Sequence, residues 1–411
     1  MANIFDYLEW RADVPLAVDP FNEVDNLVLA ELIYTDFRGI VPADGNAIPL
    51  REACEAFFRR HTREEVLAVK SFTARSPLLM EKMAEGARFG EMKLCRYLDD
   101  TDAEQETQLA AVTFLLPDDS AYVAFRGTDG TLVGWREDCN LSFQHETEGQ
   151  RRSARYLDGV GEALGGVIRV GGHSKGGNLA VYAAARCQPA LQDRILAVYT
   201  NDGPGFHEEM LQSEGYGRIL PKIVSIVPDT SVIGMMLTSL AENRVVKSAQ
   251  TGIFQHDGFS WEVSRNRFVG AELSGASRWF DRFLSEWLMH TDDQSRRDMT
   301  EIVFSVFEST GADSFREIGQ QKWRSAEAIL SAIRRLPRER QQEALSFFQK
   351  LGPAADRRSS SMSRPGFTSP MNRTGGNVDG KTDTVCQRLR AQGIQNPASG
   401  GGAAEKAGRA L

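Results

Sequence analysis

The chain has 411 residues, of which 41% are hydrophobic and 25% are charged, and its formal net charge is −8. This length can bury a large core, and the composition is typical of a globular protein rather than of a disordered chain. Phosphate binding needs a dense basic face, so the negative charge argues against nucleic acid as a partner.

The cysteines and the N-terminal residues indicate the compartment. The five cysteines form no CxxC pair and their number is odd, which favours a reducing compartment over a disulfide framework or a zinc site. Asp6, Glu9 and Asp13 stand where a secretory signal would be apolar. No apolar stretch is long enough to span a bilayer. We therefore expect a cytoplasmic protein without a transmembrane segment.

Residues 1–90 have a mostly helical pattern. In "NEVDNLVLAELIYTDF", Val24, Val28 and Leu32 fall near one helix face, and Asn22 is a candidate N-cap. We expect these residues to form a helical N-terminal extension that packs on the core.

Residues 91–265 alternate between short strand patterns and helix patterns. "AYVAFRG" and "GVIRVGG" have the composition of strands, whereas "KGGNLAVYAAARC" has that of a helix. This alternation predicts an α/β core with a mostly parallel sheet and helices on both faces.

Two further zones follow the core. Residues 266–352 have helical periodicity, with Trp279, Phe283 and Trp287 at four-residue spacing, and we expect a helical C-terminal extension. Residues 353–411 are rich in Gly, Ser, Pro and Asn, which predicts a disordered tail.

The stretch "GGHSKGG" contains a G-x-S-x-G pattern centred on Ser174. A nucleophile at the tip of a sharp strand-to-helix turn needs small neighbours, which the glycines provide. The helix that follows would place the N–H of Lys175 toward a developing oxyanion. A glycine-rich turn without chemistry, or one that binds phosphate, is the alternative.

A serine nucleophile needs a base and an acid that follow it in the chain. Of the six histidines, His207, His256 and His290 come after Ser174 with enough separation, and His256 lies in a turn after the last strand pattern. We predict His256 as the base.

Two strand patterns between Ser174 and His256 end in an aspartate. "KIVSIVPD" ends at Asp229 and "AVYTND" ends at Asp202. A buried carboxylate at either place would orient the imidazole. We favour Asp229 as the acid and keep Asp202 as the alternative.

These residues resemble two families. "AYVAFRGTDGTLVGWREDCNLSF" with "GGHSKGG" is similar to the class 3 (fungal-type) lipases, which carry F-R-G-T/S, then a tryptophan and an aspartate, then G-H-S-L-G-G. From "FDYLEWRADVPLAVDPFNEVDNLVLAELIY" to "QHDGFSWEV", the chain resembles a bacterial family of Mbeg-like α/β-hydrolase proteins. The resemblance implies an α/β-hydrolase fold for residues 91–265.

The lipase resemblance also implies roles for single residues. Thr128 and Lys175 would donate backbone N–H groups to the oxyanion, and Trp135 would lie in a lid. The lid itself would be the segment 131–141. Asp202 would shape the pocket, and Asp229 and His256 would be the acid and the base.

Two departures from the lipase pattern bear on the substrate. Lys175 replaces the usual leucine, and the lid segment carries Arg136, Glu137 and Asp138. A cation at the nucleophile favours a soluble or short-chain ester, possibly an anionic one, over long-chain triglyceride. Alternatively, Lys175 points to solvent or pairs with Glu137.

The sequence therefore predicts a serine hydrolase of the lipase or esterase type. It would cleave a carboxylic ester or related acyl bond in a small-molecule substrate, without a metal or an organic cofactor. The alternative is a non-catalytic scaffold that uses the hydrolase fold to bind a partner.

Overall fold

The computed structural model describes residues 1–69, 71–102, 104, 107–128, 137, 141, 144–275, 277–278, 331, 333–338, 340–342 and 345. The chain divides into two units, Met1–Phe348 and Gln349–Leu411. All the described residues belong to the first unit, so the tail predicted for residues 353–411 lies outside them. Most of the helical extension predicted for residues 266–352, including its three aromatic residues, lies outside them as well.

The central sheet has eight strands, and their order in the sheet follows their order in the chain. The pairings from β1 to β4 are antiparallel, and those from β4 to β8 are parallel. The strands are β1 (Ile48–Pro49), β2 (Lys93–Asp102), β3 (Thr107–Leu115), β4 (Ala121–Phe125), β5 (Ile168–His173), β6 (Ile195–Asn201), β7 (Ile223–Pro228) and β8 (Asn243–Val246). A separate pair consists of β9 (Val263–Ser264) and β10 (Arg267–Phe268). The prediction of an α/β protein with a mostly parallel sheet is confirmed.

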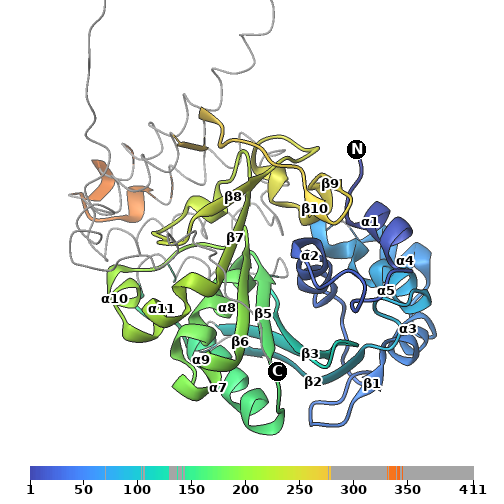
Figure 1. Ribbon diagram of the computed structural model, residues 1–411. Coiled ribbons are helices and arrows are strands. Elements are labelled where there is room, and N and C mark those ends of the chain that lie inside the picture. The colour runs from blue at the N-terminus through green and yellow to red at the C-terminus, as the bar shows by residue number, and fades with distance from the viewer. Residues whose placement is uncertain are drawn as a thin grey trace, which may run out of the picture. The chain divides into compact units, whose positions relative to one another are not determined.

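Helices cover both faces of the sheet, with α1–α5 on one side and α7–α11 on the other (Figure 1). The α-helices are α1 (Ile4–Arg11), α2 (Glu23–Leu32), α3 (Leu50–Phe58), α4 (Arg63–Ala68), α5 (Ser76–Glu85), α7 (Glu148–Ala163), α8 (Lys175–Arg186), α9 (Pro189–Arg194), α10 (Glu208–Leu211) and α11 (Glu214–Ile219). The short 3₁₀ turns are η1 (Phe72–Arg75), η2 (Leu220–Lys222), η3 (Ile233–Met235), η4 (Gly252–His256) and η5 (Gly258–Ser260).

Strand β4 shows how the two faces form. Side chains alternate across a strand, and Tyr122 and Ala124 pack into the core cluster that includes α2. Val123 and Phe125 pack into the second cluster, which includes α7 and α8. The sheet therefore separates two apolar cores, and both faces of β4 are buried.

Helix α2 begins as the sequence predicts. The side chain of Asn22 accepts hydrogen bonds from the N–H groups of Val24 and Asp25, and Asp25 accepts one from the N–H of Asn22. Every residue from Val24 to Leu32 is buried, because α2 lies between the other N-terminal helices and the sheet. Its polar residues are buried with the rest of the helix.

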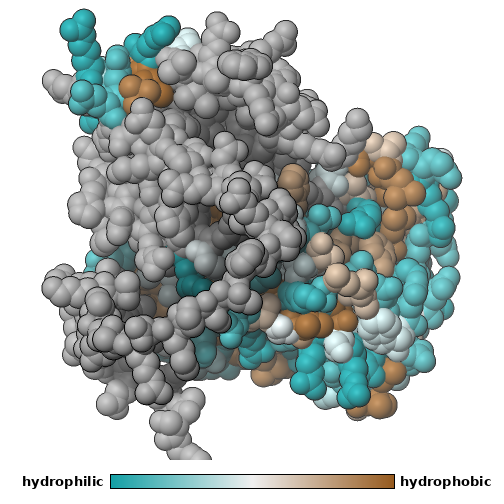
Figure 2. Space-filling view, turned by 90° about the horizontal axis from the view of Figure 1, so that it is seen from above, coloured by the Kyte–Doolittle hydropathy of each residue, from teal (hydrophilic) through white to brown (hydrophobic). Residues whose placement is uncertain are grey.

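The described surface is mixed in character. Seen from above, hydrophilic and hydrophobic side chains alternate over the N-terminal helices (Figure 2). No helix within the described ranges has the length and hydrophobicity that crossing a membrane requires.

Candidate active site

Ser174 stands between strand β5 and helix α8, as the sequence predicts. Its backbone has φ 59° and ψ −132°, which a residue with a side chain rarely adopts. Such a conformation costs about 1–3 kcal/mol and persists only where the surroundings enforce it. The N–H of Ser174 donates to the carbonyl of Asn201 at 2.9 Å, so the end of β6 fixes the turn.

The glycines on either side of Ser174 are required by close packing. A Cβ atom on Gly172 would lie 2.3 Å from the carbonyl carbon of Gly176. A Cβ atom on Gly176 would lie 2.1 Å from the carbonyl oxygen of Phe125, at the end of β4. Both distances are far below van der Waals contact, so larger residues would force the strand and the helix apart.

His256 is oriented by Asp202. The Nδ1 atom of His256 lies 2.7 Å from Oδ2 of Asp202, whose side chain is buried. The other oxygen, Oδ1, accepts hydrogen bonds from the hydroxyl of Ser231 and the N–H of Gly234. These donors hold the carboxylate in place, while the His256 side chain remains 20% exposed.

Asp229, the acid favoured from the sequence, makes other contacts. Its carboxylate accepts a hydrogen bond from the hydroxyl of Thr230, and its carbonyl accepts one from the N–H of Ser274. Both aspartates follow strands, but His256 is bonded to the one that follows β6. The structure thus corrects the choice in favour of Asp202, the alternative.

His173, which directly precedes Ser174, contacts His256. Its ring centroid lies 4.6 Å from that of His256, and its Nε2 lies 2.7 Å from the carbonyl oxygen of His256. Since His173 directly precedes Ser174, His256 lies against the turn that carries the serine. Burial, reinforced by the neighbouring His256, lowers the pKa of His173 to about 3, so the ring is neutral at physiological pH.

The side chain of Lys175 is buried rather than directed at a substrate. Its Nζ donates to Oε2 of Glu137 at 2.5 Å and to the carbonyl of Gln108 at 3.0 Å, and both charged side chains are 1% exposed. The pairing with Glu137 that the sequence left open is therefore present. Lys175 is therefore not available to attract an anionic substrate, and its charge no longer supports the preference for a short-chain or anionic ester.

The two residues expected at the oxyanion flank the turn. Lys175 begins helix α8, where the N–H groups have no partner within the helix. Thr128 is half-buried and follows Gly127, on which a Cβ atom would lie 3.1 Å from that of Ser174. Trp135, the residue expected in a lid, lies outside the described residues.

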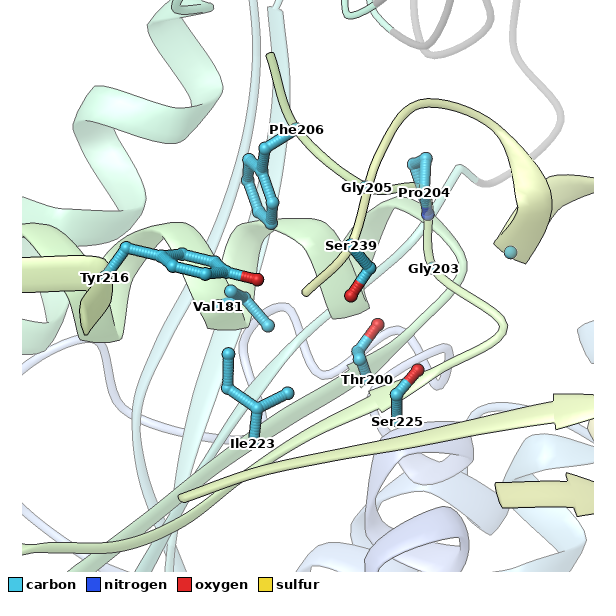
Figure 3. A pocket seen from close by; sticks show the side chains of 11 residues that line it. Val181, Thr200, Gly203, Pro204, Gly205, Phe206, Tyr216, Ile223, Ser225 and Ser239 are labelled. Atoms are coloured by element: carbon cyan, nitrogen blue, oxygen red, sulfur yellow. The ribbon is translucent and has the colours of Figure 1, made fainter. Parts of the chain in front are cut away.

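A small pocket lies under the loop that follows Asp202 (Figure 3). Phe206 and Tyr216 stand on one side of it, and hydroxyl groups of Thr200, Ser225 and Ser239 gather on the other. Residues 203–206 of that loop line this pocket, but Asp202, which was expected to shape the substrate pocket, does not. Neither Ser174 nor His256 is among its lining residues.

Residues of helix α2 and Tyr34, which follows it, reach the site from the opposite face of the sheet, which the sequence analysis did not foresee. The Asn26 amide donates to Oδ1 of Asn201 at 2.8 Å, and the Tyr34 hydroxyl lies 3.3 Å from Nδ1 of His173. Glu31 Oε1 lies 3.6 Å from the same nitrogen. The only sequence signal was the presence of polar residues inside an otherwise apolar helix.

Fold and site together define an α/β protein with a strained serine at a strand-to-helix turn. A histidine–aspartate pair contacts that turn through His173. Among the described residues, no group of His, Cys, Asp and Glu is placed to hold a metal ion. The family model described as Mbeg1-like matches residues 83–305, so the chain belongs to the Mbeg1-like family. A comparison with curated proteins gives no match.

Proposed function

We propose that the chain is a serine hydrolase that cleaves a carboxylic ester or a related acyl bond, with Ser174 as nucleophile, His256 as base and Asp202 as acid. Two observations carry this proposal. The backbone of Ser174 is strained, and the residue before it, His173, contacts a histidine whose Nδ1 is held by a buried carboxylate. Strained backbone at a single polar residue is typical of functional sites.

In the proposed mechanism, His256 carries out the proton transfers of both half-reactions. Because Asp202 occupies Nδ1 of His256, Nε2 is left to accept the proton of the Ser174 hydroxyl as its oxygen attacks the acyl carbon. His256 then gives this proton to the leaving alcohol, and an acyl-enzyme remains on Ser174. Water attacks the acyl carbon in the second half-reaction and regenerates the serine, with His256 again taking and returning the proton.

The oxyanion of each tetrahedral intermediate would be stabilised by backbone donors. The N–H groups of Lys175 and Thr128 are the candidates, because both residues adjoin the serine turn. Removing one such donor typically costs about a hundred- to a thousandfold in rate. The buried Lys175–Glu137 pair supports this role indirectly, since it anchors the first residue of α8.

The proposal is tested by reaction with a fluorophosphonate probe, which forms a covalent bond to an activated serine. We expect the wild-type protein to be labelled on Ser174, as located by mass spectrometry of the labelled peptide, and Ser174→Ala to be unlabelled. Ser264→Ala, at an exposed serine of β9, is the matched control and should label normally. Absence of wild-type labelling between about pH 6 and 9 would favour a non-catalytic role.

A further inference from the structure

Glu31 of helix α2 is a carboxyl group buried beside the histidine pair. Its side chain is 1% exposed, and a Cβ atom on Gly258 would lie 2.4 Å from its Oε1. The carboxyl group therefore touches the segment that carries His256, two residues earlier. Within the described part of the chain, Oε1 has no hydrogen-bond partner.

The hydrogen bonds of His173 determine which of its ring nitrogens carries the proton. Its Nε2 faces the carbonyl oxygen of His256, which can only accept, so Nε2 donates. In the neutral ring, Nδ1 then carries the lone pair. That lone pair meets the hydroxyl of Tyr34 at 3.3 Å and Oε1 of Glu31 at 3.6 Å.

The charged groups around Glu31 do not compensate a negative charge on it. Burial, with the nearby Asp257, raises the pKa of Glu31 well above its usual value, and Arg75 opposes this only in part. Arg75 lies 3.5 Å from Asp257, so its charge is shared with that carboxylate. A protonated Glu31 presents no charge to the lone pair of His173, whereas an ionised one would repel it and compete for the Tyr34 hydroxyl.

We propose that Glu31, in its protonated form, is a positioning residue for the hydrolytic reaction, which it supports by holding His173 and, through His173, the main chain of His256. This inference rests on the proposed function. Glu31 does not touch the reacting atoms; it keeps the Nε2–H of His173 directed at the His256 carbonyl. Ionisation of Glu31, as pH rises through its raised pKa, would loosen this contact and lower the reactivity of Ser174.

The test measures the second-order rate of fluorophosphonate labelling of the full chain from about pH 5 to 10. The labelling rate of the wild type should fall as pH rises through the raised pKa of Glu31, because Glu31 is protonated below this pKa and ionised above it. Glu31→Gln keeps a neutral group that can donate, so it should retain the neutral-pH rate within about twofold and lose this decline. Glu52→Gln, at an exposed glutamate of α3, should keep the wild-type profile.

A second variant separates positioning from packing. Glu31→Leu fills the space without a polar group beside Nδ1 of His173, and we expect its labelling rate at neutral pH to fall about five- to tenfold, roughly the effect of one lost polar contact. Equal rates for Glu31→Leu and Glu31→Gln would overturn the inference, and so would a decline with rising pH that persists in Glu31→Gln or is absent from the wild type. If Glu31→Leu does not fold, the comparison of wild type with Glu31→Gln decides alone. Wild-type protein that is not labelled at any pH contradicts the proposed function instead.

Discussion

On one side of the serine turn Glu137 is buried next to Lys175, and on the other side Glu31 is buried next to His173. Each carboxyl group has an Oε1 atom without a hydrogen-bond partner among the described residues. The second oxygen of Glu137 accepts from Lys175 Nζ and from the N–H of Gln108, so its charge is compensated. No cation within the described ranges is bonded to Glu31 in this way.

This difference separates a structural carboxylate from a titratable one. A buried carboxylate that is bonded to a lysine remains charged, and removing either partner leaves the other charge buried alone. A buried carboxyl group without a cation holds its proton instead, because desolvation penalises the charged form. We therefore assign the Glu137 side of the turn to stability and the Glu31 side to the control of reactivity.

The largest effect is expected from a substitution of Asp202, the proposed acid that is bonded to His256. Asp202→Asn should lower the labelling rate of Ser174 by about three to four orders of magnitude, because the amide cannot hold His256 in the required tautomer. Asp229→Asn should stay within about twofold of wild type, since Asp229 is bonded to Thr230 rather than to His256. Comparable losses in both variants, measured by the rate of probe incorporation, would mean that the acid is misassigned.

A second prediction concerns the buried ion pair between Lys175 and Glu137. Lys175→Met leaves Glu137 buried without its cation, and we expect the free energy of unfolding to fall by about 3–5 kcal/mol. The double variant Lys175→Met with Glu137→Leu should recover much of this loss, because no charge remains to be desolvated. Urea denaturation measures both values, and a single variant as stable as wild type would show that the pair is dispensable.

The local features of the site were predictable from the sequence. The strand, the turn and the helix around Ser174 are encoded within a few residues by an apolar run, small residues and a good helix former. The cap of α2 at Asn22 was also predicted correctly. His256, chosen by chain order, is bonded to Asp202, one of the two candidate acids. Each of these predictions depends only on the residues of one helix, strand or turn, or on the order of these segments along the chain.

The long-range features were not predictable. Asp202 and Asp229 both end strands, and only the path of the η4 turn decides which of them meets His256. The burial of Lys175 depends on Glu137, which is 38 residues away. Glu31 precedes His173 by more than a hundred residues, so no spacing rule joins them.

The smallest expected effect is on the pH dependence of stability, and it tests specifically whether Glu31 differs from Glu137. The folded protein raises the pKa of Glu31, so the stability that depends on its proton is fully present below the ordinary carboxyl pKa. This contribution is lost as pH rises through the folded pKa. In Glu31→Gln this loss is absent, so the variant should gain on wild type by up to about 1.4 kcal/mol per pH unit above about pH 4.5.

His173 contributes to the pH dependence of stability with the opposite sign. Its contribution cancels when wild type is compared with Glu31→Gln, because both proteins contain it. Its pKa is lowered to about 3 in the folded state, so it supports stability above the ordinary histidine pKa and loses that support as pH falls toward 3. Wild type and Glu31→Gln share this acid-side loss, whereas the divergence with rising pH belongs to Glu31 alone. Unfolding free energies from urea titrations at several pH values should therefore separate the two proteins only as pH rises. Parallel curves across the range, as we expect for the exposed-site control Glu52→Gln, would show that the folded protein does not raise the pKa of Glu31.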